Sequence, residues 1–168
     1  MRSWLVFDGP IRKALHTIKY RRNLALGDSL ARHMAEYVRT LDWPVEMIVP
    51  IPLGRSRMKE RGYNQVGLVA KPLAAIHGWH YVPRALVRAK ETKTQVGLTA
   101  EERRINVSGA FRANPARVSG KSVLLMDDVA TTGATLASGA TALLEAGASS
   151  VFALTLARAL PQHGLQHA

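Results

Sequence analysis

The sequence predicts an α/β protein with a central, mostly parallel sheet that is flanked by helices. Two apolar runs, at 123–126 and 151–156, are separated by a small-residue helical pattern at 134–146. This order of strand, helix and strand is that of a βαβ unit, which places its two strands parallel in one sheet. The composition agrees, because 47% hydrophobic and 21% charged residues are typical of a globular domain. A length of 168 residues suits one such domain.

Within the N-terminal segment 1–45, the pattern of residues 10–42 predicts a pair of helices. Asp8 and Pro10 are typical of a helix start, and apolar residues follow at helical spacing. A second helix is expected to start near Gly27 and to end before Pro44. The aromatic side chains here suit core packing better than stacking on an aromatic acceptor; they are Trp4, Phe7, Tyr20 and Trp43.

The middle of the chain alternates between strand, loop and helix patterns. A β-branched apolar run predicts a buried strand at 46–51, and a basic loop is expected at 53–61. The helical pattern at 64–77 contains Pro72, which predicts a kink or a restart near Lys71. The remaining expected elements are a strand at 79–88, a long polar loop at 90–109, a strand at 107–111 and a disordered tail at 161–168. In the helix 134–146, which Gly147 should end, the side chains expected to face inward are Leu136, Ala140, Leu143 and Leu144.

Charge and cysteine content limit the possible functions. The chain has 23 basic and 12 acidic residues, a formal net charge of +11, and it has no cysteine. The absence of cysteine excludes disulfides, thiolate zinc sites, iron–sulfur clusters and a cysteine nucleophile within this chain. The positive charge predicts attraction to a polyanion, and it is clustered at 19–22, 55–61 and 88–104. For any single cluster, a solvated surface is an equally good interpretation.

The segment 127–135, DDVATTGAT, carries the chemistry. It joins the predicted strand at 123–126 to the predicted helix, and ligands of open α/β sheets bind beyond the carboxyl ends of strands. Helix N-termini bind phosphate through free N–H groups and a partial positive charge. Two acids beside a phosphate would repel it unless they face sugar hydroxyls or a hydrated Mg²⁺. The alternative, a capping threonine in an acidic turn, explains the whole pattern less well.

The sequence resembles a known family at these residues. VLLMDDVATTGAT is similar to the signature by which type I phosphoribosyltransferases bind phosphoribosyl pyrophosphate (PRPP). VPIPLGRSRMKERGYNQ, KTQVGLTAEERRINVSGAF and FDGPIRKALHTIKYRRN resemble segments of the ComF family. The resemblance implies a type I phosphoribosyltransferase fold with a small helical hood at 1–45, a core at 46–158 and a flexible tail at 159–168. ComF proteins often carry an N-terminal four-cysteine zinc ribbon, which a chain without cysteine is expected to lack.

The resemblance also implies roles for individual residues. It assigns the ribose hydroxyls to Asp127 and Asp128, and these two acids would hold Mg²⁺ directly or through water. The PRPP-binding residues that it implies are Asp127, Asp128, Val129, Ala130, Thr131, Thr132, Gly133, Ala134 and Thr135. The pyrophosphate loop would be formed by Leu53, Gly54 and Arg55. The residues expected to act in catalysis are Asp127, Asp128, Lys90, Lys93, Arg103 and Arg104.

The resulting functional hypothesis is a Mg²⁺-dependent transfer of phosphoribosyl from PRPP to an unidentified acceptor, with release of pyrophosphate. The alternative is a ComF-type competence protein that binds single-stranded DNA or DNA-processing proteins without catalysis. In this alternative, the basic residues between Arg12 and Arg22 would bind the DNA or the partner protein. No signal peptide and no run of about 20 apolar residues is visible, so a cytoplasmic protein without membrane insertion is expected. A homodimer remains an open alternative.

Overall fold

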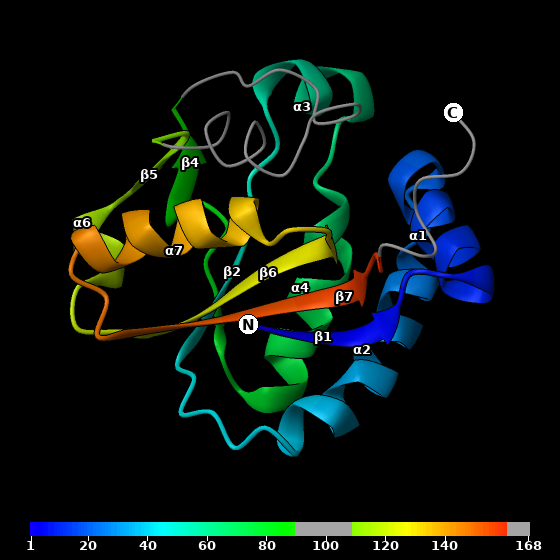
Figure 1. Ribbon diagram of the computed structural model, residues 1–168, viewed down its shortest axis with the longest axis horizontal. Helices are drawn as coiled ribbons and strands as arrows, with labels where there is room; N and C mark the ends of the chain where they lie inside the picture. Colours follow the sequence, from blue (N-terminus) through cyan, green and yellow to red (C-terminus); the bar gives the residue numbers. More distant parts are fainter. Residues whose placement is uncertain (90–108, 161–168) are drawn as a thin grey trace.

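The structure is a computed structural model in which residues 1–89 and 109–160 are described. Its centre is a five-stranded, all-parallel sheet with the order β1-β7-β6-β2-β3 (Figure 1). The strands of this sheet are β1 (Arg2–Val6), β2 (Met47–Pro50), β3 (His80–Tyr81), β6 (Ser122–Ala130) and β7 (Ser150–Arg158). A separate antiparallel pair is formed by β4 (Leu86–Arg88) and β5 (Phe111–Ala113). The predicted α/β class with a parallel sheet is therefore confirmed.

Helices cover both faces of the sheet (Figure 1). One face packs against α1 (Gly9–Arg21), α2 (Leu24–Arg39) and α4 (Gln65–His77), and the buried residues of these helices share a core with Leu124 and Met126 of β6. The other face packs against α7 (Ala134–Glu145), the β4–β5 pair and α6 (Pro115–Val118). None of the helices in the described ranges is long and apolar enough to cross a membrane.

The predicted βαβ unit is confirmed at β6, α7 and β7. The two strands are parallel neighbours, and β6 extends beyond the predicted strand to Ala130. Gly147, at φ +93°, lies just after α7 in the left-handed conformation that favours glycine. The expectation that Leu144 faces inward is wrong, because its side chain is 50% exposed. The residue that packs against the sheet in this turn of the helix is Leu143, together with Gly139, where the helix comes close to Leu125.

The N-terminal segment differs in two places from its prediction. Residues 2–6, for which no strand was predicted, form the edge strand β1, which pairs with β7. Helix α2 begins at Leu24 instead of near Gly27, because the side chain of Asn23 accepts a hydrogen bond from the N–H of Leu26 at 2.9 Å and caps the helix. Of the aromatic residues in this segment, Trp4, Phe7 and Trp43 pack against the core, whereas Tyr20 is 58% exposed.

The basic segment predicted as a loop at 53–61 contains the short helix α3 (Arg55–Arg61). It begins after Gly54, which has extended backbone, and ends at Gly62, which has φ +72°. The sequence pattern did not predict this helix, because all its side chains are exposed or partly exposed and so form no apolar stripe.

Helix α4 continues through Pro72 as one element. A proline lacks the N–H that would bond the carbonyl of Leu68, four residues earlier. In the structure, α2 approaches this carbonyl at Gly27, where a Cβ would lie only 2.6 Å from the Leu68 oxygen. Because Gly27 has no Cβ, α2 and α4 can cross closely at this point. The predicted restart near Lys71 is not observed.

The remaining predictions concern the strand after α4, the long polar loop and the C-terminal tail. The single strand expected at 79–88 is divided into β3 and β4, which belong to different sheets, with Pro83 between them. The long polar loop at 90–109 and the tail at 161–168 lie almost wholly outside the described residues.

Candidate functional site

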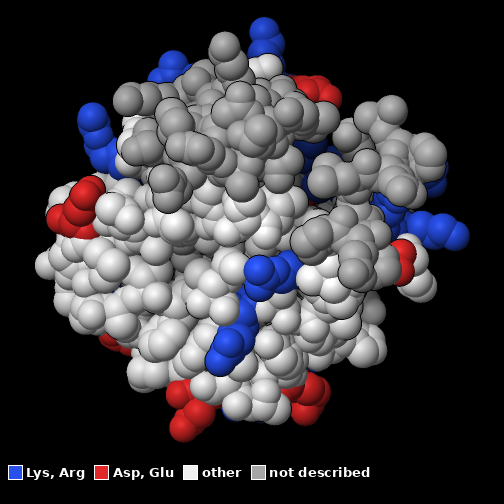
Figure 2. Space-filling model, in the orientation of Figure 1, with Lys and Arg blue, Asp and Glu red and all other residues white. Residues whose placement is uncertain are grey.

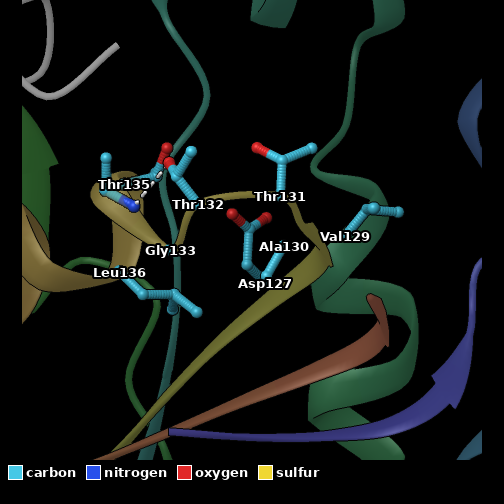
Figure 3. A pocket seen from close by; sticks show the side chains of 9 residues that line it. Asp127, Val129, Ala130, Thr131, Thr132, Gly133, Thr135 and Leu136 are labelled. Carbon is cyan, nitrogen blue, oxygen red and sulfur yellow. Dashed lines mark hydrogen bonds between the residues drawn. The ribbon is translucent and has the colours of Figure 1, made fainter. Parts of the chain in front are cut away.

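A pocket lies at the carboxyl end of β6, where the strand leads into α7 (Figure 3). Its lining consists of Asp127, Val129, Ala130, Thr131, Thr132, Gly133, Ala134, Thr135 and Leu136. Figure 3 shows the carboxylate of Asp127 pointing from the strand into the curve of the loop, between the side chains of Thr131 and Thr132. The structure thus brings together most of the residues that the sequence motif predicts for PRPP binding.

The loop 131–133 turns the chain from strand to helix. Gly133 has φ +80°, a left-handed conformation that favours glycine, and it precedes the first residue of α7. The hydroxyl oxygen of Thr132 accepts a hydrogen bond from the N–H of Ala134 at 3.3 Å. The first turn of any helix presents N–H groups that lack intrahelical acceptors, and here this turn lines the pocket. The pocket wall can therefore bind an anionic group such as phosphate.

The neighbouring acids Asp127 and Asp128 lie in different environments because successive side chains of a strand point to opposite faces. Asp127 lies on the α7 side of the sheet, as Leu125 does, and its Oδ1 accepts the backbone N–H of Asp128 at 2.8 Å. Burial and the nearby carboxylate of Asp128 raise the pKa of Asp127 well above its ordinary value. Of the two acids, Asp127 is the one that lines the pocket.

Asp128 lies on the opposite side, toward α1 and α4. Its Oδ2 is 2.9 Å from the Nζ of Lys19 and accepts a hydrogen bond from Nε2 of Gln65 at 3.1 Å, while its Oδ1 accepts the N–H of Val129 at 2.8 Å. Burial alone would raise the pKa of Asp128, but the charge and hydrogen bond of Lys19, together with the other two donors, lower it. Asp128 is thus an ionised carboxylate with three donors.

The turn 63–65 joins this junction to the rest of the sheet edge. Its three consecutive side chains bond three different elements. The hydroxyl of Tyr63 donates to the carbonyl of Ile18 in α1 at 2.6 Å, and the side-chain amide of Asn64 donates to the carbonyl of Ile51 after β2 at 2.8 Å. The third side chain, Gln65, reaches Asp128 at the end of β6. The turn therefore fixes α1, β2 and β6 relative to one another.

The segment predicted as the pyrophosphate loop follows β2, the strand next to β6 in the sheet. Leu53 and Gly54 are at least partly buried, and Arg55 is exposed as the first residue of α3. Because β2 and β6 are parallel, their carboxyl ends meet at one edge, and this segment and the pocket share that edge. Its role toward pyrophosphate stays a prediction.

Sequence reasoning missed two residues of the junction, Lys19 and Gln65. Both belong to segments that resemble the ComF family, KYRRN and RGYNQ, so the resemblance was the available signal. The basic residues between Arg12 and Arg22 were assigned to DNA or a protein partner, whereas Lys19 among them bonds Asp128. The predicted catalytic residues Lys90, Lys93, Arg103 and Arg104 lie outside the described residues.

Comparisons with known proteins agree with this geometry. Residues 19–164 match the phosphoribosyl transferase domain family. The DNA utilization protein YhgH of Salmonella typhi is 35% identical over 159 residues, which cover 92% of this chain and 70% of the relative. Competence protein F of Haemophilus influenzae is 32% identical over 161 residues, or 89% of this chain and 69% of the relative.

A solved structure shows the fold independently. The allosteric regulatory enzyme of purine biosynthesis superposes with a TM-score of 0.54 at 17% identity, over 84% of this chain and 30% of that chain. At this identity the likeness shows the fold alone, which is that of the type I phosphoribosyltransferases. The chain therefore belongs to the phosphoribosyltransferase domain family and, within it, to the ComF group of DNA utilization and competence proteins.

Proposed function

We propose that the chain binds PRPP with Mg²⁺ at the β6–α7 pocket and transfers its phosphoribosyl group to an acceptor, releasing pyrophosphate. The observation that supports this most is the Asp127 carboxylate beside a threonine-rich loop at a helix N-terminus. The loop 131–135 suits the 5′-phosphate, and a carboxylate at its base suits ribose hydroxyls. An N-capping turn without ligand would not need an acid with a raised pKa at its base.

The residues of the pocket fit Mg²⁺ that arrives with its substrate. Mg²⁺ is commonly bound through one or two carboxylates, water and substrate phosphates. Among the described residues that line the pocket there is one carboxylate, Asp127, and no cation. A polyphosphate next to this carboxylate requires a positive charge between them, which a metal ion supplies. Asp128 is held by Lys19 on the opposite side of β6 and does not line this pocket, so the proposed contact with the metal is made by Asp127.

In the proposed reaction, the bond between the anomeric carbon of ribose and the pyrophosphate oxygen breaks, and the acceptor forms a bond to the same carbon. The chain's part is to hold the ribose by Asp127 and the 5′-phosphate by the loop. Holding the ribose and the 5′-phosphate at two points orients the anomeric carbon toward the acceptor, and such positioning lowers the barrier to the reaction. The segment after β2 suits the leaving pyrophosphate by its position at the same edge.

Titration calorimetry with PRPP tests the proposal. We expect PRPP to bind in the presence of Mg²⁺ and to bind much more weakly after chelation with EDTA. Asp127→Asn should weaken binding by tenfold or more, on the order of the effect of losing a metal ligand or its partner. Glu145→Gln, an exposed acid at the far end of α7, is the matched control and should bind like the unaltered chain.

Catalysis is tested separately, by pyrophosphate release from PRPP with a panel of bases and amines. Acceptor-dependent release that Asp127→Asn abolishes would support transfer. If PRPP fails to bind at millimolar concentration with Mg²⁺ present, the pocket is not a PRPP site and the proposal fails.

A second function, binding of single-stranded DNA, is favoured by a specific surface feature and by the relatives named for DNA utilization and competence. An aromatic cluster joins the end of α1 to α3; it consists of His16, Tyr20, Arg22, Arg61 and Tyr63. The rings of His16 and Tyr20 are 4.6 Å apart, and Arg61 lies 5.3 Å from the Tyr20 ring centre. Exposed aromatic rings among cations are the platform on which single-stranded bases stack.

The wider surface does not by itself define a DNA path. On the face shown in Figure 2, Lys and Arg side chains are spread toward the top, where α3 lies, and toward the right, where α1 lies, with other cations near the centre. The aromatic cluster is therefore the more specific feature, and a variant of Tyr20 tests it.

Binding of a fluorescent oligothymidine at low and increasing salt is the measurement. We expect affinity to fall steeply with salt, because phosphate contacts release counterions. Tyr20→Ala should cost about 1–3 kcal/mol of binding free energy, whereas Tyr20→Phe keeps the ring and the affinity. Arg117→Ala, an exposed arginine on α6, is the control for loss of charge. Equal effects of Tyr20→Ala and Arg117→Ala would refute the stacking surface.

A further inference from the structure

The contacts of Asp128 point to residues outside the pocket that affect the position of the residues lining it. Asp128 is buried, and its side chain is 11% exposed, on the far side of β6 from the ligand. Three donors converge on its carboxylate, from Lys19 of α1, Gln65 of α4 and the backbone of Val129. A buried carboxylate with one donor removed is left poorly compensated, so all three contacts act on the position of this group.

The contacts of Asp128 continue into the pocket through the backbone. The N–H of Asp128 donates to the Oδ1 of Asp127, and the Asp128 carboxylate accepts the N–H of Val129, one residue before the end of β6. The position of the backbone at 127–129 is thus restrained by Lys19 and Gln65, which bond Asp128 on the side of the sheet opposite the pocket. Asp127 and the loop, which reach the ligand, are built on this restrained backbone.

The amide of Gln65 is itself oriented. Its Oε1 accepts a hydrogen bond from Nη1 of Arg61 at 3.0 Å, which leaves its NH₂ group to face Asp128. Gln65 is also the first residue of α4, so its position is fixed by the helix start that Asn64 caps. Lys19 lies in the last turn of α1 and is 28% exposed, so it reaches Asp128 from the outside of the junction.

We propose that Lys19 and Gln65 are positioning residues of the phosphoribosyl site: by holding the carboxylate of Asp128, they set the backbone of the end of β6, from which Asp127 and the following loop 131–133 reach the ligand. This inference rests on the proposed function, because PRPP is the ligand whose binding it concerns. It adds α1 and the turn 63–65 to the machinery of the site. It also gives the N-terminal helix a role in ligand binding that does not require contact with the ligand.

Removal of the Lys19 amine tests the first half of the proposal. Lys19→Met should weaken binding of PRPP with Mg²⁺ by about tenfold or more, the usual effect of losing a partner that orients a ligand-binding group. Lys19→Arg, which can still bond a carboxylate, should restore most of the affinity. Lys13→Met removes the same charge from an exposed position of the same helix and should bind like the unaltered chain.

A double-mutant cycle on PRPP affinity separates positioning from direct contact. If Lys19 acts only through Asp128, Lys19→Met should have no further effect on affinity in a chain that already carries Asp128→Asn. Additive effects would mean that Lys19 touches the ligand itself, and they would overturn the proposal. Gln65→Met, which removes the donor and keeps the length, should behave in the cycle as Lys19→Met does.

As a control for folding, the melting temperature of each variant is measured by thermal unfolding. PRPP affinities are then compared at a temperature at which all variants are folded. A purely structural role would lower the melting temperature and leave the PRPP affinity of the folded variants unchanged, which would overturn the inference alone. If the unaltered chain does not bind PRPP, the proposed function fails and this inference fails with it. The two failures are therefore distinguishable.

Discussion

The carboxylates of Asp127 and Asp128 leave β6 on opposite faces of the sheet, although the two residues are adjacent in the chain. Asp127 lies in the pocket beside the threonine-rich loop, and Asp128 is bonded to Lys19 and Gln65. Burial and the neighbouring carboxylate disfavour the charged form of Asp127, whereas Lys19 and Gln65 compensate the charge of Asp128. The same substitution at the two positions should therefore have opposite effects on stability.

We expect Asp128→Asn to lower the free energy of unfolding by about 1–3 kcal/mol, because it weakens charge-assisted hydrogen bonds to Lys19 and Gln65. Asp127→Asn should leave stability unchanged or raise it by about 0.5–2 kcal/mol, since residues at binding sites often cost stability. Urea unfolding at neutral pH measures both. A loss of stability in Asp127→Asn as large as that in Asp128→Asn would contradict the assignment of the two environments.

The raised pKa of Asp127 predicts a pH dependence of ligand binding. At low pH the carboxyl keeps its proton, and Mg²⁺ must compete with that proton for the oxygen atoms. Affinity for PRPP with Mg²⁺ should therefore rise as the pH increases through the raised pKa and become constant above it. Calorimetry in two buffers of different ionisation enthalpy would detect the released proton. The phosphate groups of the ligand also titrate, with a pKa of about 6. Asp127→Asn is the control, because any pH dependence that remains in this variant comes from the ligand and not from the carboxyl group.

The contact of Gly27 with the carbonyl of Leu68 predicts an unusual effect of alanine in a helix. Replacing a glycine in a helix interior by alanine ordinarily stabilises by about 1 kcal/mol. At Gly27 the added Cβ would lie 2.6 Å from a backbone oxygen of α4, so α2 and α4 would have to separate. We expect Gly27→Ala to destabilise by about 1–3 kcal/mol, as overpacking does. Ala25→Gly, at an exposed position of α2, calibrates the helix propensity; a stabilising Gly27→Ala would refute the close crossing.

The two bonds of Asn64 can be separated by substitution. Its Oδ1 caps α4 by accepting the N–H of Val66 at 3.0 Å, and its Nδ2 donates to the carbonyl of Ile51. Asn64→Asp keeps the cap and loses the donor, and it should cost about 1 kcal/mol of unfolding free energy. Asn64→Ala loses both and should cost about 2–3 kcal/mol. Thermal unfolding of the two variants measures the difference, and equal losses would show that the cap contributes nothing. An Asn64→Asp variant as stable as the unaltered chain would show that the bond to Ile51 contributes nothing.

Local patterns in the sequence were sufficient for several elements. The apolar run before Asp127 and the small residues after Gly133 predicted β6, α7 and the loop between them, because strand and helix periods are written in adjacent residues. The start of α1 followed in the same way from Asp8 and Pro10. The position of the pocket at a strand end and a helix start was part of the same local signal.

Elements that depend on distant partners were not predictable in this way. Strand β1 is short and partly exposed, and it is a strand because β7 offers it an edge. Helix α4 continues through Pro72, and α2 packs against it at Gly27, a contact that the residues of α4 alone do not reveal. Helix α3 has no buried side chain and therefore gave no apolar period.

The sequence by itself determined that this chain has two acids and a threonine- and glycine-rich loop between a buried strand and a helix, because the residues of this segment are consecutive. Only the tertiary structure decided what the two acids do. Asp128 meets Gln65, 63 residues away in the chain, and Lys19 from the first helix, and no periodicity relates these positions. The physical reason is that a local motif specifies the shape of its own backbone, whereas the electrostatic environment of a side chain is set by whichever elements the fold packs against it.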